Sequence, residues 1–200
     1  MFRLTPVVKN LIIVNVIVFL VQMIFSSFPV MEYLSLWNVR TPNFRPYQLF
    51  TYMFAHDKRD FMHILFNMIA LAFMGPILET FWGAKRFLLF YIIVGIGAGV
   101  FNIMTDVFFG LGTFGIMMGA SGAVYGVLTA FGITFPNMEI RLLFPPIALK
   151  AKYFVLILGS MAIFMGFRNA AGDTVAHFTH LGGIVAAIIV IQVWRLRGIR

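Results

Sequence analysis

The chain has 200 residues, of which 61% are hydrophobic, 16% aromatic and only 11% charged, with a net charge of +8. A soluble domain is about half apolar and a quarter charged, so this balance excludes an ordinary soluble protein and predicts a single all-α, polytopic membrane domain over residues 1–200. The sequence contains no cysteine, which excludes disulfides and thiol catalysis. The basic residues occur in small groups between apolar runs, which favours a role in membrane topology over binding of nucleic acid.

Six apolar segments are candidates to cross the hydrocarbon core of a bilayer, which takes roughly 20 helical residues. The predicted spans cover residues 11–28, 62–81, 87–106, 115–135, 153–168 and 174–194. The first span begins like a signal peptide, but it lacks a small-x-small cleavage signal and contains Asn15, so we expect it to be retained. No repeat relates the two halves of the chain, so the sequence does not support an inverted-repeat transporter.

The distribution of basic residues predicts that both termini lie on the cytoplasmic side (N-in, C-in). In this orientation the cytoplasmic segments hold ten Lys and Arg residues and the opposite side holds five, most of them in one long first loop over residues 29–61. This loop is too rich in aromatic and aliphatic side chains to stand in water. We therefore expect it to lie half embedded in the membrane interface.

Polar side chains inside membrane spans are costly and face the interior of a helix bundle, so they mark candidate sites. In the second predicted span His63 and Asn67 are four residues apart and share one helical face. They are either a pair that hydrogen-bonds a neighbouring helix or two donors that point into a cavity. In the sixth predicted span His180 shares a face with Gly183, which permits close helix approach, whereas His177 lies nearer the outer end.

The fourth predicted span contains a candidate nucleophile in "MGASGAVYGV", residues 118–127. Ser121 and Tyr125 lie on one helical face beside a strip of small residues. Serine alone is a poor nucleophile and needs a base within hydrogen-bond reach, for which His180 is the candidate. The alternative is that the strip serves helix packing and the serine has no chemical role. The strip consists of Gly115, Gly119, Gly122, Gly126 and Ala130.

The sequence favours a Ser–His dyad over a triad because no carboxylate is placed to orient His180. Asp173, seven residues before His180, would lie roughly 10 Å away along a helix. Tyr125 could hold the imidazole by stacking instead. Four histidines could also indicate a metal site, but a paired-histidine motif with an acidic base ("HEXXH") is absent, so we expect neither a metal nor a cofactor.

With these residues the chain resembles the rhomboid intramembrane serine proteases in their minimal six-helix form. The resemblance covers about residues 46–187 and rests on motifs that occur in the family's order: "LFTYMFAH", "HILFNM", "GPILETFWG", "GASGAVYG" and "HLGG". It implies that Ser121 is the nucleophile and His180 the general base. It also implies an oxyanion hole formed by the side chains of His63 and Asn67 and the backbone N–H of Ser121.

The resemblance and the small-residue pattern also imply supporting residues. Gly119 would occupy the turn beside the oxyanion hole, Tyr125 would pack against the catalytic histidine, and Glu79 would form structural hydrogen bonds. The fifth span and the loop after it, residues 165–175, would cover the site and move to admit substrate. The full supporting set is Gly119, Gly122, Tyr125, Gly183 and Glu79.

The sequence departs from the family's pattern in two places. Tyr47-Gln48 stands where many members have Trp-Arg, which puts the polar contacts within the first loop in doubt. Ala187 stands where a second glycine is frequent, which still permits close helix approach.

The activity implied by the resemblance is that of a serine endopeptidase that cleaves transmembrane helices near the non-cytoplasmic side. We expect an integral, multi-pass protein of a bacterial-type plasma membrane, whose partners are transmembrane protein substrates and the lipid bilayer. The sequence indicates no particular oligomeric state. The alternatives are a catalytically silent relative that binds membrane clients without cutting them, and a transporter.

Overall fold

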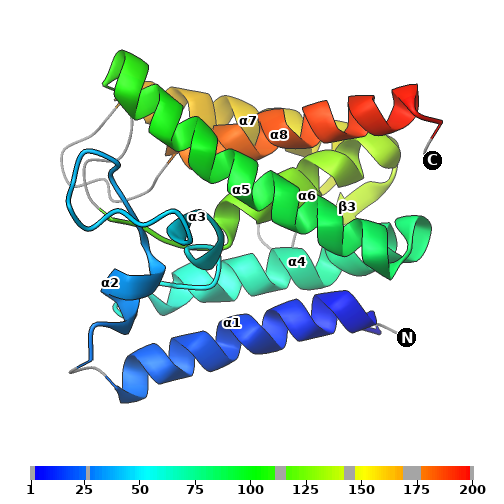
Figure 1. The fold of residues 1–200 in the computed structure, drawn as a ribbon. Coiled ribbons are helices and arrows are strands. Elements are labelled where there is room, and N and C mark those ends of the chain that lie inside the picture. The colour runs from blue at the N-terminus through cyan, green and yellow to red at the C-terminus, as the bar shows by residue number, and fades with distance from the viewer. Residues whose placement is uncertain (1–2, 26–27, 111–115, 142–146, 169–176, 199–200) are drawn as a thin grey trace.

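The computed structural model describes residues 3–25, 28–110, 116–141, 147–168 and 177–198 (Figure 1). Most of these residues are helical. The longer helices are α1 (Pro6–Ile24), α4 (Phe61–Trp82), α5 (Ala84–Phe109), α6 (Ser121–Thr134), α7 (Ala151–Arg168) and α8 (His177–Leu196). The short elements are α2 (Val30–Leu34), β1 (Leu36–Trp37), α3 (Gln48–Thr51), β2 (Ile116–Met117), β3 (Glu139–Arg141) and β4 (Ala148–Lys150).

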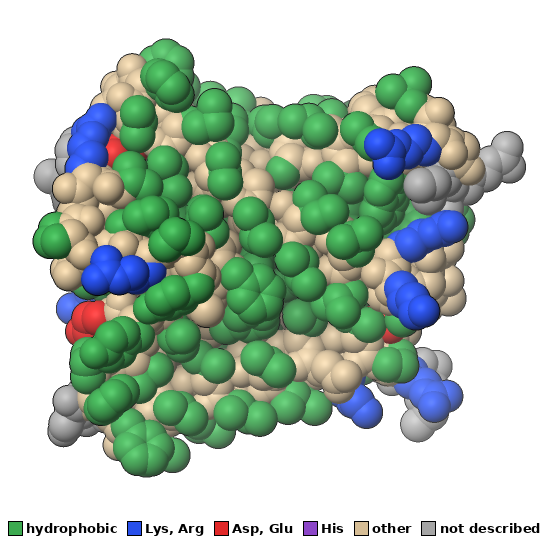
Figure 2. All heavy atoms as spheres, viewed as in Figure 1, with side chains coloured by type: hydrophobic (Ala, Val, Ile, Leu, Met, Phe, Trp, Pro, Cys, Tyr) green, Lys and Arg blue, Asp and Glu red, His purple; other side chains and the backbone are tan. Residues whose placement is uncertain are grey.

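Five of the described helices are long and apolar enough to cross a membrane, namely α1, α4, α5, α7 and α8, whereas α6 has only 14 residues. The long helices lie side by side, and both chain ends lie at the same end of the bundle (Figure 1). On the face shown in Figure 2, hydrophobic side chains cover the middle, and Lys and Arg gather at the two ends. This distribution is that of an integral, multi-pass membrane protein. The six-span count and the N-in, C-in orientation stay predictions.

The first helix differs from the predicted span over residues 11–28, because α1 begins at Pro6 and ends at Ile24. Proline suits the first turn of a helix, where its missing N–H would have no intrahelical partner. The carboxylate of Glu79 in α4 accepts the backbone N–H groups of Val7 and Val8 at 3.0 and 2.9 Å, and also the Thr5 hydroxyl. A carboxylate from another helix therefore caps α1, which local hydropathy does not reveal.

The fourth helix also differs from the prediction, because the span expected over residues 115–135 begins as a helix only at Ser121. Ile116 and Met117 form strand β2, and the chain then turns at Gly119, whose φ is 118°. Gly119 is therefore not part of the predicted helical strip of small residues. Gly122, Gly126 and Ala130 do lie in α6, and Gly115 lies outside the described residues.

The first loop is folded against the bundle rather than being a uniform interfacial segment. Leu36, Tyr52 and Met53 are buried, and side chains of this loop contact Gly95 and Gly99 of α5. Part of its apolar character therefore serves packing inside the protein. Aromatic rings on its outer side stay exposed, namely Tyr33, Tyr47 and Phe50.

Gln48 supplies polar contacts within this loop at one of the positions where the sequence departs from the family's pattern. Its Oε1 accepts the backbone N–H of Arg45 at 2.9 Å and that of Trp37 at 3.4 Å, and its Nε2 donates to the carbonyl of Asn43 at 3.2 Å. A buried glutamine thus ties the start of α3 to the preceding turn and to β1.

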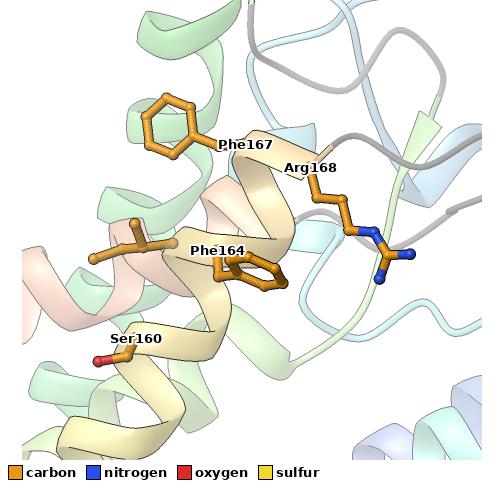
Figure 3. Close-up of a pocket in the computed structure, with 5 residues that line it drawn as sticks. Ser160, Phe164, Phe167 and Arg168 are labelled. Carbon is orange, nitrogen blue, oxygen red and sulfur yellow. The ribbon is translucent and has the colours of Figure 1, made fainter.

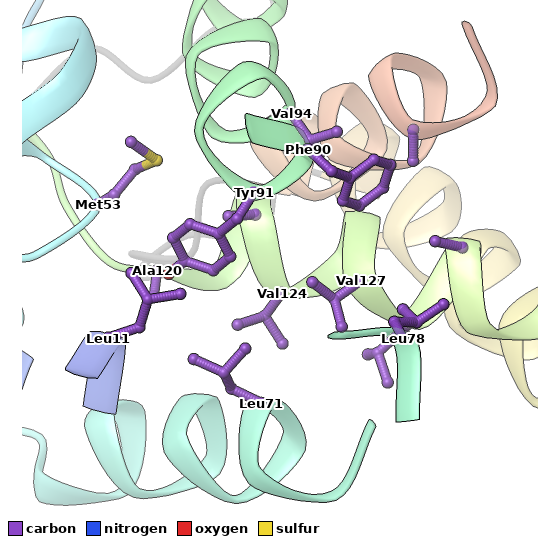
Figure 4. Packing of buried hydrophobic residues seen from close by; sticks show 14 of the residues in the cluster. Leu11, Met53, Leu71, Leu78, Phe90, Tyr91, Val94, Ala120, Val124 and Val127 are labelled. Atoms are coloured by element: carbon purple, nitrogen blue, oxygen red, sulfur yellow. The ribbon is translucent and has the colours of Figure 1, made fainter. Parts of the chain in front are cut away.

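Helix α6 lies at the centre of the bundle, where it packs against α4, α5, α7 and α8. Most of the buried side chains between these helices are apolar (Figure 4). Close backbone approach is possible because the facing residues are small: Gly126 lies against Val94 of α5, and Gly183 of α8 lies against the backbone of Gly122. Among the residues labelled in the figure, α4 contributes Leu71 and Leu78, α5 contributes Phe90, Tyr91 and Val94, and α6 contributes Val124 and Val127.

Replacing Gly183 by alanine should destabilise the fold. A Cβ at this position would overlap the carbonyl oxygen of Gly122. Because the clash is with backbone rather than with a flexible side chain, α6 and α8 would have to move apart to relieve it. We expect Gly183→Ala to lower the free energy of unfolding by about 2 kcal/mol or more, as overpacking in a core does. The measurement is unfolding in detergent. Gly159→Ala in α7 is the matched control, because its Cβ would meet Ile184 Cδ1 at an ordinary 3.4 Å, and equal losses in both variants would contradict the packing argument.

Candidate active site

Ser121 and His180 come together across the interface of α6 and α8. Ser121 is the first residue of α6, and His180 lies in the first turn of α8. The Nε2 atom of His180 is 2.8 Å from the Oγ atom of Ser121, and both residues are partly exposed. This distance is that of a hydrogen bond between a hydroxyl and an imidazole nitrogen. A proton can therefore pass from the serine to the histidine without any movement of the backbone.

Tyr125 holds the plane of the His180 ring. It lies one turn after Ser121 on α6, and its ring stacks on the imidazole with centroids 4.2 Å apart and planes inclined by 6°. His177, the other histidine of this helix, has its ring 6.0 Å from that of His180 in an edge-on arrangement. The tyrosine restricts rotation of the imidazole, so that Nε2 stays directed at Ser121.

The turn before Ser121 requires glycine at position 119 for two reasons. Its φ of 118° is disfavoured for residues with a Cβ, and a Cβ there would lie 2.6 Å from Nε2 of His63. The turn is fixed by antiparallel pairing of β2 with β1 and by a 2.9 Å hydrogen bond from the Gly119 N–H to the carbonyl of Tyr52. The first loop thus holds the segment that leads into Ser121.

His63 and Asn67 of α4 face this turn. The ring of His63 lies directly beside Gly119, as the close approach at that glycine indicates. The Nδ2 atom of Asn67 donates to the carbonyl of His63 at 2.9 Å and lies 3.4 Å from Nε2 of His56. Ser121 begins a helix, and the first N–H groups of a helix have no partner within it. The Ser121 N–H therefore has no partner within α6, and the side chains of His63 and Asn67 lie beside the turn that leads into it.

His56 is a residue of this site that the sequence analysis does not single out. It is completely buried, and its Nε2 lies 3.4 Å from the backbone nitrogen of Ala120, which precedes Ser121. The signal in the sequence is a histidine that ends the apolar loop motif "LFTYMFAH". Burial, with a smaller effect of the neighbouring His63, lowers the pKa of His56 to about 3, against an opposing effect of the Phe54 backbone. His56 is therefore neutral at neutral pH.

The buried His56 should make the protein less stable in acid. Its pKa in the folded protein is about 3 against an ordinary 6.5, so between these values the unfolded chain binds more protons and stability falls as the pH falls. We expect this residue to account for about 2 kcal/mol of lost stability between pH 7 and pH 5. The measurement is thermal unfolding in detergent at both pH values. His56→Gln should show a smaller loss on acidification, and an equal loss would contradict the assignment.

The described carboxylates at the ends of the helices have partners away from the Ser–His pair. Glu79 caps α1, and Asp106 accepts a 2.8 Å hydrogen bond from Asn38 of the first loop, with Arg40 nearby. Asp173 lies outside the described residues. Within the described ranges, no three His, Asp or Glu side chains gather in a way that could hold a metal ion.

A depression of about 600 Å³ lies on the outer side of α7, lined by Ser160, Ile163, Phe164, Phe167 and Arg168 (Figure 3). Its lining does not include the Ser–His pair, and exposed rings of Phe164 and Phe167 suit contact with lipid. Most of the loop expected to cover the site, residues 165–175, lies outside the described residues, so its predicted movement stays a prediction.

These features define a multi-pass helical membrane protein with a serine and a histidine in contact between two of its helices. The model of the Rhomboid domain matches residues 43–196. The chain belongs to the rhomboid family.

Three curated proteins are similar in sequence. The chain is 30% identical to "Putative rhomboid protease YdcA" of Bacillus subtilis over 95% of this chain and 91% of that protein. It is 33% identical to "Rhomboid protein 1, mitochondrial" of Saccharomyces cerevisiae over 68% of this chain, and 30% identical to "RHOMBOID-like protein 1" of Arabidopsis thaliana over 76%. The matches span only 38% and 35% of the length of the yeast and plant proteins.

Proposed function

We propose that this protein is an intramembrane serine endopeptidase that cleaves transmembrane helices. The observation that carries the proposal is the 2.8 Å contact between Nε2 of His180 and Oγ of Ser121 in a member of the rhomboid family. A relative that binds membrane clients without cutting them would not need this contact. The similarity to a Bacillus subtilis protein named as a rhomboid protease supports the proposal further.

In the proposed reaction the hydroxyl of Ser121 attacks the carbonyl carbon of the scissile peptide bond while His180 accepts its proton. The C–N bond then breaks, and His180 returns the proton to the leaving amine. Water then attacks the acyl-enzyme while His180 accepts a proton from it; the ester C–O bond breaks, and His180 returns this proton to Oγ of Ser121. Ser121 and His180 are both partly exposed, and the proposed second half-reaction requires that this exposed side be open to water.

The negative charge on the carbonyl oxygen would be stabilised by the donors on the α4 side of the serine. We propose that the Ser121 N–H and the side chains of His63 and Asn67 serve this purpose. Asn67 donates to the His63 carbonyl, so its second amide proton is the one available to the oxyanion. In the free protein this proton faces Nε2 of His56, 3.4 Å from Nδ2 of Asn67. When substrate binds, it would turn from His56 to the oxyanion.

Truncating Asn67 should slow the chemical step. We expect Asn67→Ala to lower kcat by about 10²- to 10³-fold with little change in KM, as the loss of one oxyanion donor does. The measurement is steady-state cleavage of a transmembrane substrate in liposomes. Phe66→Ala is a matched control on the same helix, because this neighbouring ring is 66% exposed. A normal kcat for Asn67→Ala would remove this residue from the proposed oxyanion hole.

The proposed function is tested by reconstitution with a model single-span substrate. Its helix should carry glycine or proline near the outer end, because an intact helix hides its peptide bonds from a nucleophile. We expect wild-type protein to cut this substrate at one place near the outer interface, located by mass spectrometry of the two fragments. Stable binding of uncut substrate by the wild-type protein would instead favour the client-binding alternative.

A further inference from the structure

A buried histidine outside the proposed Ser–His pair lies at the junction of three parts of the fold. His56 belongs to the segment between α3 and α4 and is completely buried. Its Nε2 lies 3.4 Å from the backbone nitrogen of Ala120, next to Ser121, and 3.4 Å from Nδ2 of Asn67. One ring nitrogen therefore contacts both the turn that presents the nucleophile and the amide proposed for the oxyanion hole.

The two contacts determine which nitrogen of His56 carries the proton. The Ala120 N–H and the Asn67 amide are both donors, so Nε2 accepts and the proton of the neutral ring lies on Nδ1. Distances of 3.4 Å are long for single hydrogen bonds, as is expected for one acceptor shared between two donors. A protonated ring would direct an N–H at both donors and lose both contacts. The low pKa of His56 keeps it neutral at neutral pH.

The position of His56 is fixed from its other side by the first helix. The Nε2 atom of Gln22 in α1 donates to the carbonyl of His56 at 3.0 Å, and the N–H of His56 donates to Oε1 of Gln22 at 3.2 Å. Gln22 is itself buried. The ring of His63 lies 5.1 Å from that of His56 at 66°, which restricts rotation of the imidazole. The histidine is thus held by its own backbone and by a neighbouring ring.

We propose that His56 is a positioning residue, which orients the oxyanion hole by holding the Ala120 N–H and the Asn67 amide through its Nε2 atom. The inference rests on the proposed function. With the Ala120 N–H directed at His56, the next N–H along the chain, that of Ser121, is the one that faces the developing oxyanion. With Nδ2 of Asn67 drawn towards the same atom, the amide stays beside the turn before substrate arrives. His56 does not touch substrate.

The test compares two substitutions that differ by one methylene. In His56→Gln an amide oxygen can reach the place of Nε2, whereas in His56→Asn the side chain reaches only as far as Nδ1. We expect His56→Asn to lower kcat by about 10- to 100-fold with KM changed less than about 3-fold, and His56→Gln to recover most of that loss. Equal kcat values for the two variants would overturn the inference.

Introducing the same substitution into the Asn67→Ala variant distinguishes a positioning role of His56 from a general structural defect. If His56 acts through Asn67, its substitution matters less once Asn67 is truncated, because contacting residues are coupled. We expect His56→Asn to lower kcat by a smaller factor in the Asn67→Ala background than in the wild-type protein, because only the contact with the Ala120 N–H then remains to be lost. The same fold-loss in both backgrounds would contradict the inference, since a structural defect would multiply with the other substitution.

Should His56→Asn fail to fold, Gln22→Met replaces it. Methionine keeps the length of the side chain but cannot make the two hydrogen bonds to the backbone of His56. We expect a lower kcat with unchanged KM, and a wild-type kcat would contradict the inference. Wild type and Ser121→Ala are assayed alongside. If these two cleave equally the proposed function fails, whereas a loss confined to Ser121→Ala leaves only the role of His56 to be decided.

Discussion

Ser121→Ala should abolish cleavage of a transmembrane substrate, with kcat lowered by at least about 10⁴-fold. The reason is that the substitution removes the Oγ atom, the proposed nucleophile that attacks the peptide carbonyl. The Oγ atom lies 2.8 Å from Nε2 of His180, so its loss also leaves the base without its proton donor. The measurement is the initial rate of fragment formation in liposomes, at equal amounts of folded protein.

Ser160→Ala is the matched control for that substitution. It makes the same chemical change in α7, where Ser160 is exposed and lines the outer depression rather than the α6–α8 interface. We expect this variant to cut at a rate within about 3-fold of wild type, as surface substitutions do. Normal cleavage by Ser121→Ala would show that Ser121 is not the nucleophile, whatever the rate of Ser160→Ala.

His180→Ala should cause a loss of similar size. His180 Nε2 is the hydrogen-bond partner that the described residues supply to the Ser121 hydroxyl, and an unassisted hydroxyl is a poor nucleophile at neutral pH. The double variant with Ser121→Ala should be no slower than either single variant, because residues that act as a unit are not additive. The same liposome assay measures all three rates.

His177→Ala is the matched control, because it removes the same side chain one turn away on the same helix. The ring of His177 lies 6.0 Å from that of His180, whereas it is His180 that stacks on Tyr125 and contacts Ser121. We expect His177→Ala to retain a rate within about 3-fold of wild type. Loss of cleavage in His177→Ala together with normal cleavage by His180→Ala would show that His177, not His180, is the base.

The sequence predicts the long helices well where hydropathy alone determines them. The span expected over residues 62–81 corresponds to α4, Phe61–Trp82, and the one over residues 153–168 to α7, Ala151–Arg168. The prediction is wrong where tertiary contacts decide the boundary. Glu79 caps a helix distant in the sequence, and Gly119 turns the chain after a short strand, although the residues around it are as apolar as a membrane helix.

In the candidate site too, local sequence patterns predict the residues on the helices but not those that tertiary contacts bring in. Ser121, His180 and Tyr125 can be brought together from helical periodicity and from the faces that small residues leave accessible, and the structure gives the distances that periodicity cannot. Their catalytic roles stay predictions. His56 could not be found this way, because it lies in a loop without periodicity and its contacts with Ala120 and Gln22 come from distant segments.

Covalent labelling reports whether Ser121 is activated by His180. A fluorophosphonate reacts with a serine that an adjacent base activates, without needing any natural substrate. After labelling in detergent and digestion, mass spectrometry should locate the adduct on Ser121 in wild-type protein and find none in His180→Ala. Wild-type protein that cleaves substrate but carries its adduct on a different serine, or none on Ser121, would contradict the claim that Ser121 and His180 form the catalytic pair.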